Sequence, residues 1–240
     1  MSQNETEFLN NYDRNAYVSP LATVDAAIFT FWQDDLYVLL TKRSEHPAKG
    51  RWALPGGFVD EQKDKVLEDT VVRKLKEKTG VIAPYVEQLC TIGNKKRDVR
   101  GWSVTVVYTA LIAHQTCQSH VENVSDVKWV TYTEAAKSKL AFDHAEILKL
   151  ARERLKQKAL YSIIPVYALP EEFTLPELQR LHEVLLHKPL QKKSFRRRIE
   201  KAELVEEAGQ RAPNGKGRPS VVYRLKADAR DHTFTRNLEY

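Results

Sequence analysis

Short apolar runs separated by polar turns occupy much of the first 160 residues and indicate strands. Two apolar segments between residues 21 and 43 are separated by Gln33-Asp34-Asp35, which predicts two strands joined by a turn. The apolar sequences at 102–113 (WSVTVVYTALIA) and 126–132 (DVKWVTY) predict two further strands. The Gly and Pro residues of RWALPGGF, at 51–58, predict a loop.

Three helices are predicted among these strands. Apolar residues recur at helical spacings between residues 65 and 79, and Gly80 stands where a left-handed C-terminal cap is expected. A second helix is expected at about 133–140, and a third from Asp143, whose spacing to Glu146 resembles a capping box. The apolar stripe of the third helix consists of Ile147, Leu148, Ala151 and Leu155. This order of elements predicts an α/β sandwich built on a mixed sheet.

A different pattern begins after the segment 161–172, whose two prolines interrupt a continuing helix. Thr174 and Glu177 form a capping box with Pro176 in the first turn, and they predict a new helix. A short turn at 187–190 follows it. The buried face of this helix is expected to consist of Leu175, Leu178, Leu181, Leu185 and Leu186.

A second helix is expected after the turn, from about Gln191 to Val205. Its buried residues are expected to be Phe195, Ile199 and either Ala202 or Leu204. A stretch rich in Gly, Pro and Asn at 208–219 leads to an alternating strand at 220–225. Helix, short turn, helix and hairpin are typical of a winged helix-turn-helix domain. We therefore expect two domains, residues 1–158 and residues 159–240.

Charge is distributed unevenly between these two parts. The 240-residue chain has a net charge of +6. Residues 151–240 contain 19 Lys and Arg against 12 Asp and Glu, a net charge of +7, whereas residues 1–150 carry −1. This asymmetry favours an anionic partner for the C-terminal domain, although charge alone describes a solvated basic surface equally well.

The remaining composition excludes several classes of protein. With 42% hydrophobic and 29% charged residues, the chain is expected to be globular. No apolar run approaches the roughly 18 residues of a transmembrane helix, and the polar, acidic N-terminus is unlike a secretory signal peptide. Cys90 and Cys117 have neither metal-binding nor disulfide spacing, so reduced thiols are expected. Together these features predict a cytoplasmic protein that does not bind a membrane.

Residues 54–81 resemble a Nudix box. In that pattern a glycine is followed by five residues, a glutamate, seven residues, and then Arg-Glu-hydrophobic-x-Glu-Glu-x-Gly-hydrophobic. The matching residues are Gly57, Arg73, Leu75, Glu77, Gly80 and Val81, together with Trp52 and the Leu-Pro-Gly before the box. The resemblance implies a Nudix-like ligand-binding domain at the N-terminus.

The box lacks most of the carboxylates that bind metal in active Nudix enzymes. Lys74 and Lys78 replace two of three clustered glutamates, and the early glutamate, counted back from Arg73, falls on Lys65. Divalent cations need several oxygen ligands, whereas the two lysines present ammonium groups on one helix face. We therefore expect no catalytic residue, no metal site and no cofactor. The two lysines either attract a diphosphate directly or are solvated.

Other residues around the box have the chemistry to bind a nucleotide. Guanidinium groups suit phosphates, and aromatic rings suit the face of a base. His144 is either a ligand contact or a locally packed helix residue. The predicted ligand-binding set is Arg43, Arg51, Trp52, Gly56, Gly57, Arg73, Lys74, Glu77, Lys78, Arg97, Arg100, Trp102 and His144.

The chain as a whole resembles the Nudix-related transcriptional regulators, the NrtR family. The resemblance rests on the degraded box, RDVRGW at 97–102, LAFDHAEIL at 140–148, PEEFTLPELQ at 170–179 and KKSFRRRI at 192–199. Members of that family are repressors of NAD metabolism genes that sense ADP-ribose. The resemblance implies a repressor that senses ADP-ribose or a related dinucleotide without hydrolysing it.

The second helix of the helix-turn-helix opens with a basic run, and such helices present their N-terminal residues to the major groove. With Phe195 and Ile199 facing the core, the outer faces carry the expected contacts to double-stranded operator DNA. These are Lys192, Lys193, Ser194, Arg196, Arg197 and Arg198. Lys216 and Arg218 of the wing are expected to reach phosphates or the minor groove. Domains of this type bind two half-sites, which favours a homodimer.

Two other functions fit parts of the pattern. An active ADP-ribose pyrophosphatase, tethered to nucleic acid by its basic domain, would need the missing glutamates. An RNA-binding module would be expected to carry stacking aromatic residues in the basic helix, which this helix lacks. The sequence does not specify the operator, the effector, the direction of its effect or the dimer interface.

Overall fold

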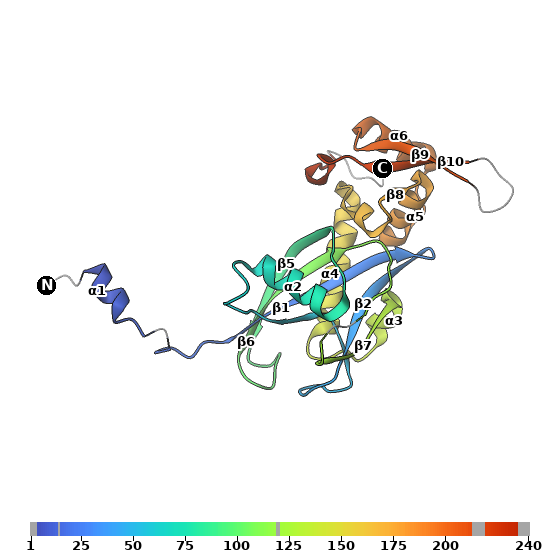
Figure 1. The fold of residues 1–240 in the computed structure, drawn as a ribbon. Helices are drawn as coiled ribbons and strands as arrows, with labels where there is room; N and C mark the ends of the chain where they lie inside the picture. The colour runs from blue at the N-terminus through green and yellow to red at the C-terminus, as the bar shows by residue number, and fades with distance from the viewer. Residues whose placement is uncertain (1–3, 14, 119–120, 213–218, 235–240) are drawn as a thin grey trace.

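The computed structural model describes residues 4–13, 15–118, 121–212 and 219–234. Two lobes are stacked along one long axis, and an N-terminal segment extends away from the lower lobe (Figure 1). This segment contains helix α1 (Glu5–Asn10), which buries none of its residues and which the sequence did not predict. Within the described residues no helix is long and apolar enough to cross a membrane.

The lower lobe is built on a seven-stranded sheet. Its strands are β1 (Leu21–Trp32), β2 (Asp35–Arg43), β3 (Trp52–Ala53), β4 (Gly56–Phe58), β5 (Tyr85–Asn94), β6 (Ser103–Leu111) and β7 (Val124–Thr131). The main order is β3-β2-β1-β6-β5, while β4 pairs with β1 and β7 with β2. β1 and β6 run parallel and the other pairs run antiparallel, so the predicted mixed sheet is confirmed.

Three strands of the lower lobe were not predicted from the sequence, nor was the two-residue β8 (Glu172–Phe173) of the upper lobe. β5 is an edge strand in which only Tyr85 is buried, so its residues show little apolar alternation. The segment 51–58, predicted as a loop, contains β3 and β4. These two short strands owe their conformation to pairing with β2 and β1, which local sequence does not reveal.

Helices cover both faces of the sheet and complete the predicted sandwich. One face packs against α2 (Leu67–Thr79), whose Val71 and Leu75 are buried, and Gly80 ends α2 at φ 72°. The other packs against α3 (Tyr132–Lys137) and α4 (His144–Tyr161). The expected apolar stripe of α4 is buried. Its expected capping box is wrong: the side chain of Asp143 makes no cap hydrogen bond.

The upper lobe is a winged helix-turn-helix domain, as predicted. It contains η1 (Ile164–Ala168), β8 (Glu172–Phe173), α5 (Leu175–Leu186), α6 (Lys192–Ala202), β9 (Val205–Arg211), β10 (Ser220–Leu225) and η2 (Ala229–Asp231). The Thr174 capping box and all five expected leucines of the buried face are confirmed. α6 ends at Ala202, earlier than expected, because Glu203 is left-handed and Val205 already belongs to β9.

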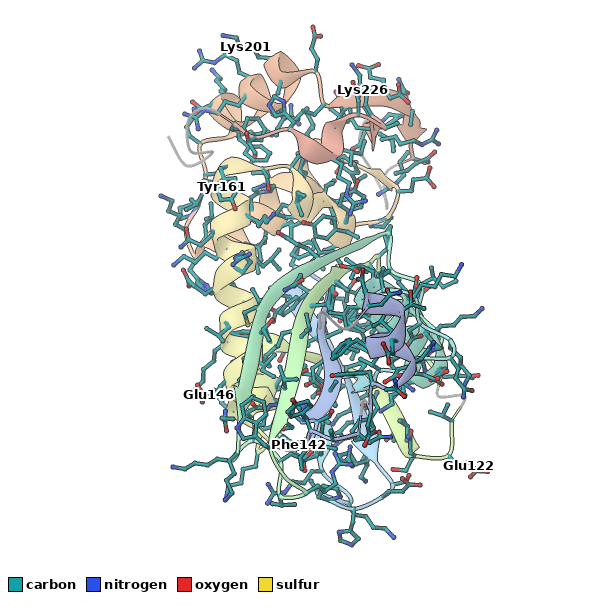
Figure 2. All side chains as sticks on the ribbon, turned by 90° about the vertical axis from the view of Figure 1, so that its left-hand side faces the viewer. Glu122, Phe142, Glu146, Tyr161, Lys201 and Lys226 are labelled. Atoms are coloured by element: carbon teal, nitrogen blue, oxygen red, sulfur yellow. The ribbon has the colours of Figure 1, made fainter. Side chains whose placement is uncertain are left out.

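The two lobes share one hydrophobic core. A continuous cluster of buried side chains extends from the sheet through α4 and η1 into α5 and α6. Figure 2 shows α4 rising from Glu146 in the lower lobe to Tyr161 beside the upper lobe. The predicted domain boundary, between residues 158 and 159, falls within the last turn of α4 and remains a prediction.

Candidate functional site

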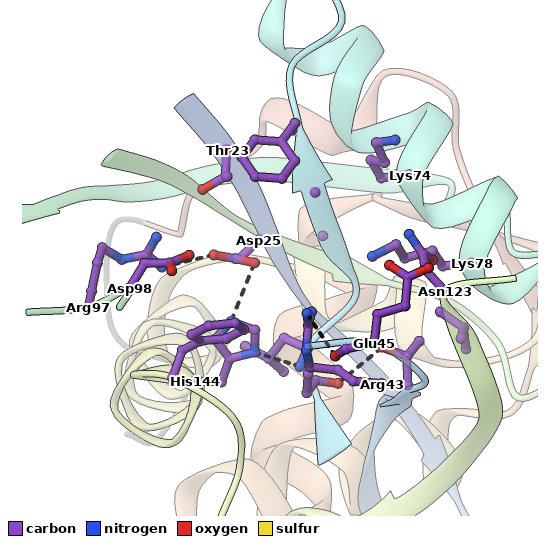
Figure 3. Close-up of a pocket in the computed structure, with 18 of the residues that line it drawn as sticks. Thr23, Asp25, Arg43, Glu45, Lys74, Lys78, Arg97, Asp98, Asn123 and His144 are labelled. Atoms are coloured by element: carbon purple, nitrogen blue, oxygen red, sulfur yellow. Dashed lines mark hydrogen bonds and ion pairs between the residues drawn. The ribbon is translucent and has the colours of Figure 1, made fainter. Parts of the chain in front are cut away.

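A polar pocket opens where β1, β2, β4, α2, the 95–101 loop and the start of α4 meet. Figure 3 shows Lys74 and Lys78 on one side of this pocket and Arg97 and Asp98 on the other, with Asp25 between them. Eight members of the predicted ligand-binding set line it, namely Arg43, Gly56, Gly57, Lys74, Lys78, Arg97, Arg100 and His144. The fold therefore gathers residues that span about 100 positions of the sequence.

The two lysines of the degraded box face this pocket from α2. Lys74 Nζ lies 3.1 Å from Glu77 Oε2, and its side chain is 19% exposed. Its aliphatic part passes over Gly57, where an added Cβ would come within 3.0 Å of it. Burial, with the positive charges of Lys74 and Arg43 nearby, lowers the pKa of Lys78 to about 8. Lys78 thus loses its proton at a lower pH than an exposed lysine does, unless an anion stabilises the charge.

Two acidic residues of the box, Asp64 and Glu77, form internal ion pairs. Asp64, one position before the residue reached by counting, accepts hydrogen bonds from the guanidinium group of Arg73 at 2.5 and 2.7 Å. This pairing holds the pKa of Asp64 well below its usual range. Glu77 is shared between Arg73, at 3.3 Å, and Lys74, at 3.1 Å. The segment between Gly57 and Arg73 is two residues longer than the Nudix pattern, so the spacing did not identify Asp64 in the sequence.

These residues do not fit the divalent metal that the Nudix fold implies. Such a cation needs several carboxylate oxygens pointing at one place. Here one carboxylate, Glu77, already pairs with two cationic side chains, those of Arg73 and Lys74. The next residue, Lys78, places an ammonium group at the pocket where a metal ligand would be needed. Among the described residues, no cluster of three His, Cys, Asp or Glu has the proximity to hold a metal.

A buried ion-pair network forms the opposite wall of the pocket. Arg97 donates to both oxygens of Asp143, at 3.0 Å each, and to Asp25 at 3.1 Å. Asp25 also accepts from Thr105 Oγ1 at 2.8 Å, and its other oxygen lies 3.5 Å from His144 Nε2. Asp25 and Asp143 were not predicted from the sequence as partners of Arg97, since Asp25 belongs to an apolar strand and Asp143 to an apparent helix cap.

His144 is held in one orientation by its two neighbours. Its Nδ1 accepts the backbone N–H of Leu54 at 2.8 Å, so the ring proton is carried by Nε2 on the side of Asp25. Burial lowers the pKa of His144, which favours the neutral ring. The sequence left open whether His144 is a packed helix residue or a ligand contact. In the structure it is buried among its neighbours and also lines the pocket.

Two arginines at the pocket rim lie over aromatic rings. The guanidinium of Arg43 lies 5.0 Å from the centre of the Phe142 ring, and its Nε donates to the Pro47 carbonyl at 2.8 Å. The guanidinium of Arg100 lies 5.0 Å from the Phe58 ring and pairs with Asp98 at 2.6 Å. Both side chains line the pocket, and their aromatic partners add flat apolar surface beside the cationic groups.

Five predicted ligand residues do not line this pocket. Arg51 lines a neighbouring cavity, which shares Arg97 and Phe142 with the first one. Trp52 packs against the core beneath the ammonium group of Lys128, 4.3 Å from its ring. The remaining three are Arg73 and Glu77, in the α2 ion pairs, and Trp102, which covers Gly93 on the sheet.

The basic helix α6 forms a second candidate surface on the upper lobe. Phe195 and Ile199 are buried as expected, and Lys192, Lys193 and Arg197 are exposed. The other predicted contacts, Ser194, Arg196 and Arg198, are partly buried. Gln191 caps the helix by accepting the Ser194 N–H at 2.5 Å. Lys216 and Arg218 of the wing lie outside the described residues.

Comparison with known proteins assigns a family to each lobe. Residues 22–151 match the NUDIX domain, and residues 165–225 match the NrtR DNA-binding winged helix domain. The chain is 47% identical to the ADPR responsive transcriptional repressor NtrR of Acinetobacter baylyi, and the match covers 98% of this chain and 94% of that protein.

Solved structures match the chain over both lobes. The crystal structure of Shewanella oneidensis NrtR complexed with a 27mer DNA is similar with a TM-score of 0.84 and 56% identity, over 91% of this chain and 99% of that one. The NUDIX domain of Shewanella oneidensis NrtR complexed with ADP ribose has a TM-score of 0.63 and 55% identity, over 64% of this chain and 99% of that one. The chain therefore belongs to the NrtR family, in which a NUDIX domain precedes a DNA-binding winged helix domain.

Proposed function

We propose that this protein is an ADP-ribose-responsive transcriptional repressor of NAD metabolism genes. One observation carries the proposal: the metal-binding end of a Nudix box has become a cationic wall, with Lys74 and Lys78 facing the pocket from α2. A relative with 47% identity is named as an ADPR-responsive repressor. Solved NrtR structures contain DNA in one case and ADP ribose in the other.

The pocket suits a dinucleotide diphosphate without a bridging metal. Lys74, Lys78 and Arg43 supply three cationic groups around one opening, and the Arg43–Phe142 pair supplies a flat surface. Guanidinium and ammonium groups bind phosphate oxygens by charge-assisted hydrogen bonds. The ligand contacts proposed in the pocket are Arg43, Gly56, Gly57, Lys74, Lys78, Arg97, Arg100 and His144. Arg51, Trp52, Arg73, Glu77 and Trp102 are proposed to support these contacts from outside the pocket.

The Nudix domain is proposed to bind its ligand without hydrolysing it. Hydrolysis of a diphosphate by this fold depends on carboxylates that hold metal ions and activate water. In this chain, lysines stand at two of those positions, and Glu77 is bound to Arg73 and Lys74. The physical difference between a sensor and an enzyme is therefore concentrated in a single turn of α2.

The upper lobe is proposed to bind operator DNA through α6. The exposed Lys192, Lys193 and Arg197 are placed to reach base edges and phosphates, with Ser194, Arg196 and Arg198 beside them. Lys216 and Arg218 of the wing are proposed to contact phosphates or the minor groove. Two copies would present two such helices to two half-sites, so we propose that the repressor is a cytoplasmic homodimer.

A gel-shift experiment tests the proposed function directly. Duplexes selected by the full-length protein from a random DNA pool serve as probes, and ADP-ribose is titrated without added metal. We expect ADP-ribose to release the DNA, while AMP at the same concentration serves as the control nucleotide. A protein that selects no sequence, or whose DNA binding ignores ADP-ribose, would contradict the proposal. Metal-dependent consumption of ADP-ribose would favour the pyrophosphatase instead.

A further inference from the structure

Helix α4 connects the nucleotide pocket with the helix-turn-helix. Its first residue, His144, lines the pocket and is anchored by the Leu54 N–H at 2.8 Å. The preceding Asp143 is held by Arg97, another pocket residue, at 3.0 Å. From there α4 runs to Tyr161 at the base of the upper lobe (Figure 2). The start of α4 is therefore part of the ligand site.

Arg152 of α4 makes direct hydrogen bonds to the other lobe. It lies eight residues after His144, about 12 Å along the helix axis. Its side chain is buried, and its Nη2 donates to the carbonyl of Leu185 at 2.8 Å and to that of Val184 at 3.2 Å. The same nitrogen lies 3.1 Å from Nε2 of His187.

The carbonyls that Arg152 binds belong to the last turn of α5. Carbonyls in the last turn of a helix have no amide of the same helix to accept from. The backbone amides of His187 and Lys188 both donate to Glu183, so they leave Val184 and Leu185 to the arginine. A positive charge is also favourable at a helix C-terminus. Arg152 is therefore a C-terminal cap for α5 supplied by a helix of the ligand-binding domain.

The end of α5 determines where α6 begins. His187 ends α5 in a left-handed conformation, at φ 56°, and the next residues form the turn to α6. The N–H of Leu190 donates to Glu183 Oε1 at 2.9 Å, and the Leu190 carbonyl accepts from Gln179 Nε2 at 3.1 Å. These bonds join α5, the turn and the start of α6 into one unit. A shift of Arg152 relative to α5 would thus move the N-terminus of α6.

We propose that Arg152 is the positioning residue through which the nucleotide pocket controls the recognition helix. This inference rests on the proposed function, since it assumes that ADP-ribose changes DNA affinity. Ligand contacts at His144 and Arg97 displace α4, and Arg152 carries the displacement to the end of α5. An ion pair also joins the lobes, Arg180–Asp34 at 3.8 Å, but it is largely exposed, and such surface pairs contribute little.

The test compares Arg152→Met with Arg154→Met in the full-length protein. Arg154 lies on the same helix, is 40% exposed and is near Glu87 within the ligand-binding lobe, so it is a matched control.

DNA affinity is measured by fluorescence anisotropy, with and without ADP-ribose, on a duplex selected by the wild-type protein. We expect ADP-ribose to change wild-type and Arg154→Met affinity about 5–150-fold. For Arg152→Met the change falls below about threefold, while ADP-ribose still binds with wild-type affinity in calorimetry. Arg152→Lys, which keeps the charge and loses the guanidinium fork, is expected to lie between them.

Full coupling in Arg152→Met would overturn the inference. A wild-type protein with no response to ADP-ribose would instead contradict the proposed function. Hydrogen exchange on the wild-type protein provides a test that does not depend on a variant folding. ADP-ribose is expected to change the exchange of the His187, Lys188 and Leu190 amides at least severalfold. If those amides exchange at the same rate with and without ADP-ribose, the route through Arg152 is wrong.

Discussion

Lys78 shows how one substituted side chain changes the chemistry of the Nudix pocket. Its pKa of about 8 reflects burial and the nearby charges of Lys74 and Arg43, so its ammonium form is poorly stabilised without a ligand. In the unfolded chain the same group titrates near 10.5. Below pH 8 the buried ammonium group of Lys78 therefore lowers the free energy of unfolding. The penalty is relieved as pH rises from about 8 to 10.5, because the folded protein has then already lost the proton.

Binding of ADP-ribose should therefore be coupled to proton uptake. A diphosphate beside Lys78 favours its charged form and raises its pKa, so at pH 8.5 the complex takes up a proton that the free protein lacks. We expect ADP-ribose affinity to fall as pH rises above about 8. Calorimetry at pH 8.5 in two buffers of different ionisation enthalpy measures the uptake. It should vanish in Lys78→Met and persist in Lys76→Met, whose lysine is exposed on the same helix. Equal uptake in both variants would remove Lys78 from the site.

The same two lysines predict that ADP-ribose is not hydrolysed. Product formation with Mg²⁺ or Mn²⁺ should equal that of a sample without protein, because Glu77 alone remains and is bound to Arg73 and Lys74. Chromatography of AMP and ribose phosphate over several hours measures it. Metal-dependent turnover that disappears in Glu77→Gln would show that the box has kept its chemistry.

Hydrogen bonds at both ends of helix α5 stabilise the upper lobe. The Thr174 hydroxyl accepts the Glu177 N–H at 3.3 Å, and the Glu177 carboxylate accepts the Thr174 N–H at 2.6 Å. Arg152 caps the other end of α5 from outside the helix. Since α5 supports α6, both ends contribute to the position of the DNA-binding surface.

Removing the N-terminal cap should destabilise the protein measurably. Thr174→Ala loses the hydroxyl that accepts an otherwise unpaired amide, which costs about 1 kcal/mol of unfolding free energy. Thr174→Ser keeps the hydroxyl and should stay within about 0.5 kcal/mol of the wild type. Urea unfolding followed by tryptophan fluorescence gives both values. An unchanged midpoint for Thr174→Ala would mean that the box contributes little in this setting.

The exposed charges of α6 are expected to contribute to DNA affinity. Lys193 and Arg197 are four residues apart and exposed on the same face. Each change to Ala should weaken DNA binding by about 1–3 kcal/mol. A residue that touches only phosphate should also reduce the salt dependence by roughly one counterion. Filter binding across a range of salt concentrations separates these two roles. Arg154→Ala removes one positive charge from α4 and should leave affinity unchanged; equal losses in all three variants would indicate a nonspecific charge effect.

At the scale of the whole molecule, one core joins the two lobes, so their functions need not be independent. A ligand shifts DNA affinity only when it binds the DNA-competent arrangement differently from the alternative. In a dimer, a small rotation of α4 in each copy would change the spacing of both recognition helices. The expected coupling of about 1–3 kcal/mol corresponds to a change of roughly 5–150-fold in affinity.

Linkage makes that coupling testable from either ligand. The factor by which ADP-ribose changes DNA affinity must equal the factor by which DNA changes ADP-ribose affinity. Calorimetric titration of ADP-ribose into free protein and into the protein–DNA complex measures the second factor, and gel shift measures the first. Equal ADP-ribose affinity in the two titrations would show that the pocket and α6 do not communicate.

Local pattern was sufficient for β1, β2, β6 and β7 and for the helices α2 to α6, but not for α1 or for the strands β3, β4 and β5. Amphipathic spacing predicted α4, α5 and α6, because burying one face of a helix leaves a periodic trace in the sequence. The helix α2 was predicted too, but Val66 and Val72, which were counted in its apolar face, are exposed. The replacement of box carboxylates by Lys74 and Lys78 could also be seen in the sequence, since it changes the charge whatever the surrounding fold; the absence of a metal site stays a prediction. Helix α6 could be predicted because it follows a capped helix and a short turn, and its role as a recognition helix stays a proposal.

Tertiary structure alone decided the partners of the charged residues. Asp64 pairs with Arg73, and Asp143 pairs with Arg97. Asp25 contacts Arg97 and His144, which are 72 or more residues away from it in the chain. Arg152 has the sequence context of a solvent-exposed helix residue, yet it is buried and caps a helix of the other lobe. Electrostatic and hydrogen-bond partners depend on distance in space, and sequence spacing reports that distance only within a helix turn or a strand pair.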